Sequence, residues 1–162
     1  MGERNKDLTN SMEDYMEAIH NLEEDKGCAT TGDISSYLGV NPASVTGMMH
    51  KLDKRGFVTY ERYRGVVLTK KGRKIGKSIK KRHEILSTFL ILLGIDREIA
   101  ERDACKIEHD VDSITFEYLT KFVQFIQGAP NNPKWLIHFK HYTQTGERLH
   151  CDRAFAGGDA PT

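Results

Sequence analysis

Apolar residues recur at helical spacing through most of this chain. Tyr15, Ile19 and Leu22 occupy the i, i+4 and i+7 positions of one helix face, which follows the capping residue Ser11. Similar patterns predict further helices at 31–38, 42–55, 69–95, 97–112, 113–126 and 135–142. Asp96 and Ser113 are the predicted capping residues of the helices over 97–112 and 113–126. Residues 57–60 and 66–68 differ, because their β-branched and aromatic residues are typical of two strands joined by a short turn. The pattern predicts a mainly α fold.

The middle of the chain has the order of elements of a winged helix-turn-helix. The helix at 31–38, capped by Thr31, ends at Gly39, and Asn41-Pro42 provides a cap followed by proline at the first position of the next helix. The strand pair that follows would form the wing. We predict a winged helix-turn-helix domain over 1–76, an all-helical domain over 77–142 and a C-terminal tail over 143–162.

Basic residues are concentrated around this region. Thirteen of the 24 Lys and Arg residues lie between positions 51 and 82, together with only two acidic residues, although the whole chain has a net charge of +1. Such a segment is either a solvated basic helix or a surface for a polyanion. Because it accompanies the helix-turn-helix pattern, we interpret it as a surface for DNA.

The predicted recognition helix offers short side chains to a major groove and cations to phosphates. The candidates for contact with base edges are Asn41, Pro42, Ala43, Ser44 and Thr46. The candidates for contact with phosphates are Lys51, Arg55, Arg62 and Arg64. A helical hairpin that does not bind DNA is the alternative, and the charge argues against it. We predict double-stranded operator DNA as the partner.

The stretch 101–112, ERDACKIEHDVD, combines a packing face with a polar face. Its apolar stripe is Ala104, Ile107 and Val111. Drawn as an α-helix, it brings four other side chains into one arc of about 100°: Glu101, Cys105, Glu108 and His109. A thiol, an imidazole and carboxylates at this spacing suit a divalent transition metal. A partly exposed polar flank with a buried structural cysteine would give the same pattern.

Other predicted helices supply further candidates for this site. Asp14 and Glu17 adjoin the apolar stripe of the first helix, where they could simply be favourable charges at a helix N-terminus. His83, where the basic half of the long helix meets its apolar half, could be a polar core or surface residue. However, clustered carboxylates repel one another, and a divalent ion removes that repulsion. We therefore predict seven metal ligands: Asp14, Glu17, His83, Glu101, Cys105, Glu108 and His109.

Two further features bear on assembly and compartment. The second half of the long helix is apolar on more than one face, so we expect residues 89–93 at a two-fold interface with a second copy. The three cysteines are far apart and form no disulfide framework, which favours a reducing cytoplasm. No apolar run approaches the length of a membrane span, and the N-terminus lacks the apolar segment of a signal peptide.

Five stretches of the chain form a specific combination: SMEDYMEAI (11–19), VNPASVTGMMHKLDKRGFV (40–58), YRGVVLTKKGRKIG (63–76), RHEIL (82–86) and DACKIEH (103–109). In this combination the chain resembles the diphtheria toxin repressor and manganese transport regulator family of metal-dependent repressors. The resemblance implies a dimeric winged-helix protein that binds operator DNA when loaded with Fe²⁺ or Mn²⁺. It also implies repression of metal-uptake genes.

By motif, the resemblance implies the ligands of manganese-type members at Asp14, Glu17, His83, Glu108 and His109. Cys105 instead matches the iron-type branch, because the manganese branch has glutamate there. Asp14 departs from the iron-type branch, which has methionine. Glu101 stands where iron-type members have an ancillary histidine. The resemblance thus implies a hybrid site for Mn²⁺ or Fe²⁺, with Co²⁺, Ni²⁺ and Zn²⁺ as further metals in vitro.

Two other functions are compatible with parts of the pattern. A winged-helix regulator could respond to an organic ligand or act without metal, and a metalloenzyme could hold a metal-bound water; no general base or substrate pocket is identifiable for the latter.

Residues 127–162 match neither branch, end too early for the SH3-like third domain of iron-type members, and should finish in disorder over 154–162. A surface role is favoured over metal binding for His138, His141, His150 and Cys151. We predict a cytoplasmic, homodimeric, metal-dependent transcriptional repressor that is not an enzyme.

Overall fold

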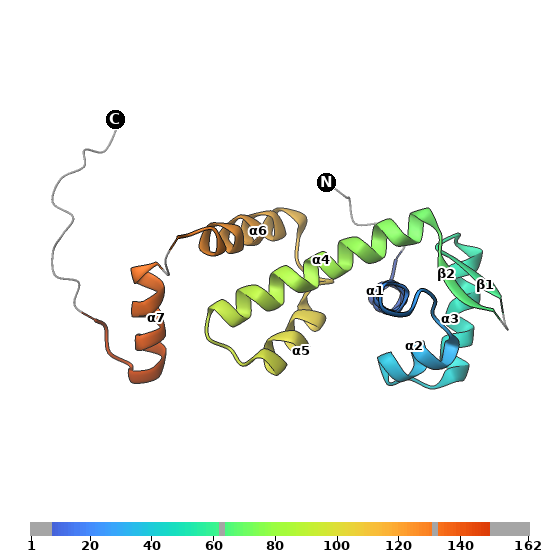
Figure 1. Cartoon of the computed structure of the whole chain (residues 1–162), viewed down its shortest axis with the longest axis horizontal. Helices are drawn as coiled ribbons and strands as arrows, with labels where there is room; N and C mark the ends of the chain where they lie inside the picture. The colour runs from blue at the N-terminus through green and yellow to red at the C-terminus, as the bar shows by residue number, and fades with distance from the viewer. Residues whose placement is uncertain (1–7, 62–63, 131–132, 150–162) are drawn as a thin grey trace, which may run out of the picture.

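The computed structural model describes residues 8–61, 64–130 and 133–149. Within them the elements are, in order, α1 (Asn10–Lys26), α2 (Thr31–Leu38), α3 (Pro42–Lys54), β1 (Val58–Glu61), β2 (Gly65–Leu68), α4 (Lys70–Leu92), α5 (Arg97–Ile107), α6 (Ser113–Gln127) and α7 (Lys134–Thr145). Figure 1 shows α4 as a long central helix, with α1–α3 and the β1–β2 hairpin at one end and α5–α7 at the other. The predicted mainly α architecture is confirmed.

Most of the helix starts were predicted to within two residues, but three capping residues were wrong. The structure has Thr9, Thr30 and Asp112 as N-caps in place of Ser11, Thr31 and Ser113. In each case the earlier residue has an extended backbone, and its side-chain oxygen accepts a hydrogen bond from a main-chain N–H of the first turn. A Ser or Thr just inside the helix cannot make this bond. The caps predicted at Asn41 and Asp96 are confirmed.

The hydrophobic core of the first domain forms between α1, the α2–α3 pair and the hairpin. Met16, Ile19, Ile34 and Met49 are all fully buried there. The two strands pair antiparallel, with Val58 opposite Leu68. Glu23 on α1 ties these parts together, because its carboxylate accepts hydrogen bonds from the Leu68 N–H at 2.7 Å and from Arg73 of α4 at 2.8 Å.

α4 lies against α1 at close range. At Gly76 the two backbones approach so closely that an added Cβ would lie 2.9 Å from the carbonyl oxygen of Met16. Glycine at this position therefore permits the approach. The packing places the side chains of α1 beside those of the middle of α4, where His83 lies.

α5 ends earlier than predicted, at Ile107. Glu108 is its C-capping residue, and His109 lies in the turn beyond the helix. The guanidinium of Arg82 donates hydrogen bonds to the carbonyls of Glu108 (3.1 Å) and Val111 (3.3 Å), which satisfies acceptors that a continuing helix would have used. The predicted apolar stripe is wrong in part, because Ile107 is 40% exposed.

The helices beyond α5 leave apolar side chains uncovered. Phe89 of α4 packs edge to face against Phe122 of α6, yet Tyr118 and Phe125 of α6 are 65% and 69% exposed. α7 begins one residue earlier and ends three residues later than predicted, at Thr145. No helix in the described part of the chain is long and apolar enough to span a membrane. Among the C-terminal candidates, His138 and His141 lie on α7, whereas His150, Cys151 and the predicted disorder fall outside the described residues.

Candidate metal centre and DNA-binding surface

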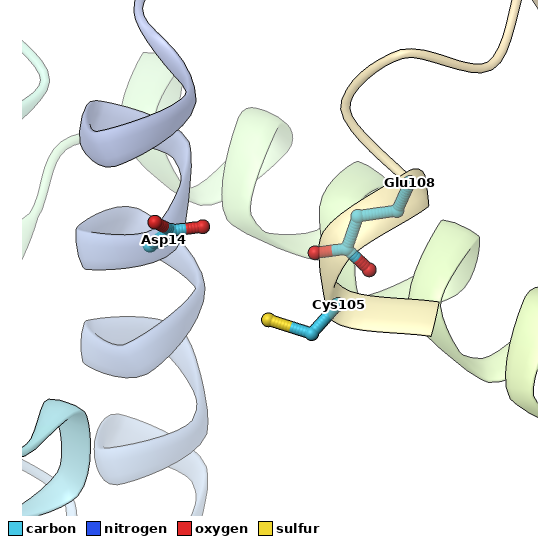
Figure 2. A group of neighbouring side chains, drawn as sticks. All are labelled: Asp14, Cys105 and Glu108. Carbon is cyan, nitrogen blue, oxygen red and sulfur yellow. The ribbon is translucent and has the colours of Figure 1, made fainter. Parts of the chain in front are cut away.

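Side chains from three helices meet between the two halves of the molecule. Asp14, Cys105 and Glu108 each offer one ligand atom within 4.8 Å of the others, and Glu17, His83 and Glu108 form a second group by the same measure. Figure 2 shows Asp14 on α1 facing Cys105 and Glu108 at the end of α5. Five of the seven predicted ligands therefore converge, and Glu108 belongs to both groups.

Glu108 is the centre of this arrangement. It is 1% exposed. One carboxylate oxygen, Oε2, lies 3.1 Å from Nδ1 of His83, while Oε1 lies 3.5 Å from Nε2 of His109 and has no hydrogen-bond partner among the described residues. A buried carboxylate oxygen without a partner is costly unless a cation satisfies it.

His109 reaches the same place from the turn after α5. Its Nδ1 lies 2.7 Å from Oε2 of Glu13, and its Nε2 lies 2.7 Å from Oδ1 of Asp14. The Nε2 contact is short, but it lacks hydrogen-bond geometry, so Nε2 is a second buried atom without a hydrogen-bond partner. Glu13 is not among the seven predicted ligands, and its signal in the sequence is its place one turn before Glu17 on the same helix face.

The two remaining candidates occupy the edge of the cluster. Glu101 lies outside both groups, and its Oε2 is 2.8 Å from Nε2 of His83. Glu101 therefore contacts a ligand candidate on the side away from Glu108. Cys105 is exposed, which excludes the alternative of a buried structural cysteine.

Burial and, after it, the crowding of acidic groups raise two pKa values in the cluster. Burial, followed by the charge of Glu108, raises the pKa of Glu17 to about 7. The same two causes raise the pKa of the Cys105 thiol to about 11, because the sulfur is shielded locally although the residue is exposed. Without metal, therefore, Cys105 is a thiol at neutral pH.

The two imidazoles carry protons that offset this negative charge. Hydrogen bonding to Glu108 is the main cause that raises the pKa of His83 to about 9. Contact with Asp14, and then with Glu13, raises the pKa of His109 to about 10. In the metal-free chain both rings are therefore cationic at neutral pH, and a bound metal would take the place of these protons.

The residues present fit a divalent transition metal. Carboxylate and imidazole donors suit Mn²⁺ and Fe²⁺, and a thiolate adds affinity for the later metals. Two of the three unpartnered buried side-chain atoms in the described part of the chain, Oε1 of Glu108 and Nε2 of His109, lie 3.5 Å apart within the cluster. A cleft of about 540 Å³ borders the site, lined also by Tyr37 and Lys80.

Most of the predicted DNA-binding residues on α3 and the hairpin that the structure describes are exposed. Asn41 caps α3 through a hydrogen bond from the Ala43 N–H, and Thr46 donates to the carbonyl of Pro42, so both side chains also serve the helix. The other candidates on α3 and its end are exposed: Pro42, Ala43, Ser44, Lys51 and Arg55. Arg64 at the hairpin has a side chain that is 84% exposed and lies 3.3 Å from Glu61. Arg62 falls outside the described residues.

Two family models match the chain in succession. The model "Iron dependent repressor, N-terminal DNA binding domain" matches residues 7–66. The model "Iron dependent repressor, metal binding and dimerisation domain" matches residues 69–136. The chain belongs to the iron-dependent repressor family. It is a metal-dependent, DNA-binding transcriptional regulator, and the alternative of a metalloenzyme is excluded.

Individual relatives agree with this family. The chain is 44% identical to the HTH-type transcriptional regulator MntR of Bacillus velezensis over 136 residues, which are 84% of this chain and 96% of that protein. It is 48% identical to MntR of Geobacillus kaustophilus over 139 residues, 86% of this chain and 99% of that one. Among solved structures, the manganese regulator SloR is similar with a TM-score of 0.64 and 28% identity, covering 73% of this chain but only 55% of SloR.

Proposed function

We propose that this repressor-family protein is a cytoplasmic homodimer that binds palindromic operator DNA when loaded with Mn²⁺ or Fe²⁺, and that it represses metal-uptake genes. The observation that carries the proposal is the cluster in which Asp14 and Glu17 of α1 meet Cys105 and Glu108 of α5. The family model supports iron, and the likeness to a manganese regulator supports manganese. Both ions suit a site dominated by carboxylate and imidazole.

The site joins the DNA-binding unit to the helices expected to dimerise. α1 belongs to the core that holds α3, and the other candidates lie on α4 and at the end of α5. A bound divalent ion supplies positive charge between the carboxylates. Asp14 and Glu108 then hold α1 and α5 at one separation, which selects one spacing of the two recognition helices. A coupling of about 1–3 kcal/mol would change operator affinity roughly 5–150-fold.

The geometry supports two adjacent metal positions in each protomer. One group of potential ligands contains Asp14 and Cys105, the other contains Glu17 and His83, and both use Glu108. The two carboxylate oxygens of Glu108 point to different neighbours, His83 and His109. Glu108 would therefore help to hold a metal at either position.

The proposed dimer would cover the apolar groove between α4 and α6. This groove is lined by Phe89, Ile114, Thr115, Tyr118, Leu119 and Phe122. Ile114 and Tyr118 are more than half exposed, which is unusual for large apolar side chains outside an interface. Sedimentation of a monomer at micromolar concentration, with or without metal, would rule the dimer out.

The central experiment measures binding to an operator fragment with chelator and then with each metal restored. We expect weak binding under chelation and a roughly 5–150-fold gain with Mn²⁺ or Fe²⁺. Arg64→Ala is a matched control, because loss of a phosphate contact should weaken binding equally with and without metal. Unchanged binding after chelation would instead favour a regulator that responds to an organic ligand or to none.

Cys105 gives a spectroscopic prediction about metal choice. A thiolate ligand to Co²⁺ produces a sulfur-to-metal charge-transfer band in the near ultraviolet. We expect this band in the Co²⁺-loaded protein, because the Cys105 sulfur lies within 4.8 Å of ligand atoms of Asp14 and Glu108, and we expect Cys105→Ser to remove it. Absence of the band, or its persistence in Cys105→Ser, would show that the thiol is not a ligand and that the site does not favour later metals through sulfur.

A further inference from the structure

Glu13 contacts the metal centre without belonging to either group of potential ligands. Its carboxylate Oε2 lies 2.7 Å from Nδ1 of His109, and the two residues are 96 positions apart in the chain. The Glu13 side chain is 12% exposed and the His109 side chain 5% exposed, so water has little access to this contact. On its other side, the His109 ring directs Nε2 toward Asp14 and Glu108.

An acidic residue in the first turn of a helix often does no more than complement the helix dipole. Glu13 does lie in the first turn of α1. However, a dipole effect requires only an exposed carboxylate, whereas burial of a carboxylate is unfavourable unless a specific partner compensates for it. The partner here is the one imidazole nitrogen that faces away from Asp14 and Glu108. The hydrogen bond with Nδ1 of His109 therefore explains why Glu13 can be buried.

We propose that Glu13 is a positioning residue for the metal centre, an inference that rests on the metal-dependent function proposed above. Its Oε2 accepts the hydrogen bond that Nδ1–H of His109 donates, which leaves the lone pair of Nε2 as the donor available to a metal. A neutral imidazole has one N–H and one lone pair, so the hydrogen bond at one nitrogen decides which nitrogen can ligate. Partners of this kind also hold the plane of the ring.

The position of Glu13 gives the hydrogen bond a second consequence. Glu13 belongs to α1, in the DNA-binding half, whereas His109 lies in the turn after α5. Arg82 of α4 holds the same turn through the carbonyl of Glu108. His109 is therefore fixed from both sides before a metal arrives, and its Nε2 needs little rearrangement on binding.

The test compares Glu13→Ala and Glu13→Gln with the wild type. Mn²⁺ affinity is measured by titration, and the His109 ring is observed by ¹⁵N NMR in the diamagnetic Zn²⁺-loaded protein. In the wild-type protein we expect Zn²⁺ to bind Nε2 of His109 and the proton on Nδ1 to be protected from exchange with water. Glu13→Ala should expose that proton to exchange and lower Mn²⁺ affinity about 10–100-fold. Glu13→Gln keeps an acceptor oxygen and should restore both properties in large part.

Glu24→Ala is the matched control, because Glu24 is also on α1 and pairs with Lys80 outside the cluster. A surface ion pair of this kind contributes little, so Mn²⁺ affinity should stay within about twofold of the wild type. The role of Glu13 would be overturned if Zn²⁺ bound Nδ1 of His109. It would also be overturned if Glu13→Ala changed neither the Mn²⁺ affinity nor the exchange of the Nδ1 proton. The metal-dependent function itself would be overturned if the wild-type protein bound no Mn²⁺ and the Glu108→Gln variant gave the same titration as the wild type.

Discussion

Glu108→Gln is expected to abolish the effect of metal on operator binding while the metal-free protein stays folded. Glu108 is the residue that both groups of potential ligands share, and its side chain is fully buried between them. Glutamine has nearly the same shape but no charge, so it removes the carboxylate that both groups share without opening a cavity. The whole metal-dependent gain, roughly 5–150-fold in operator affinity, should disappear.

Metal-free stability separates this effect from misfolding. The charge of Glu108 is one cause of the raised pKa of Glu17, which indicates repulsion between the two carboxylates in the absence of metal. Removing the charge relieves this repulsion, but it also removes the buried ion pair that Glu108 makes with the cationic His83 ring, so we expect the metal-free variant to remain folded with a lower free energy of unfolding than the wild type. Saturating Mn²⁺, at 100 times its dissociation constant, should stabilise the wild type by about 2.7 kcal/mol and the variant by much less.

Asp103→Asn is the control for Glu108→Gln, because Asp103 also lies on α5 but its side chain is 43% exposed and pairs with Lys106. This variant should retain both the response of operator binding to metal and the stabilisation by Mn²⁺. If Glu108→Gln responded to Mn²⁺ as the wild type does, Glu108 would not be a ligand. The proposal that the cluster at the end of α5 is the switch would then fail.

Gly72→Ala is expected to produce the largest loss of stability among the glycine variants of the first domain. A Cβ at this position would lie 1.9 Å from the carbonyl oxygen of Phe57 and 3.1 Å from Cδ2 of Leu68. The carbonyl cannot move easily, because it accepts hydrogen bonds from the N–H and the hydroxyl of Thr69. The start of α4 would have to separate from the wing. We expect the free energy of unfolding, measured in urea, to fall by about 1–3 kcal/mol.

Gly47→Ala provides the matched comparison. Gly47 lies inside α3, and a Cβ there would meet no atom within 4 Å. Alanine has the higher helix propensity, so this variant should gain up to about 1 kcal/mol in the same urea experiment. If Gly72→Ala were as stable as the wild type, the close packing of α4 on the wing would not exist in solution.

Local signals were sufficient to predict the DNA-binding half. Gly39 and Asn41-Pro42 mark the turn between α2 and α3, and the structure has the αL conformation at Gly39 and the side-chain cap at Asn41. The strand pair was also predicted, with limits that differ by one residue. Capping, proline at the first helical position and alternation of apolar residues act between near neighbours, so the sequence carries them directly.

The end of α5 could not be predicted from local signals. Residues 108–112 fit a continuing helix in the sequence, yet the helix stops at Ile107, where Arg82 of α4 takes up the carbonyl of Glu108. As a result His109 leaves the helix and reaches Asp14 and Glu13 of α1. Helical spacing placed Glu101 and His109 on one face, whereas the structure puts them on different sides of Glu108.

Neighbouring residues and composition encode the helices, the wing, the basic segment over 51–82 and the residue types of the candidate metal centre, so these features could be predicted from the chain. Which of these residues meet depends instead on how the helices pack. Glu108 lies in both groups, Glu101 pairs with His83, and Glu13 lies behind His109. These contacts join positions up to 96 residues apart. They exist because α1, α4 and the end of α5 pack together, and no periodicity along the chain encodes that packing.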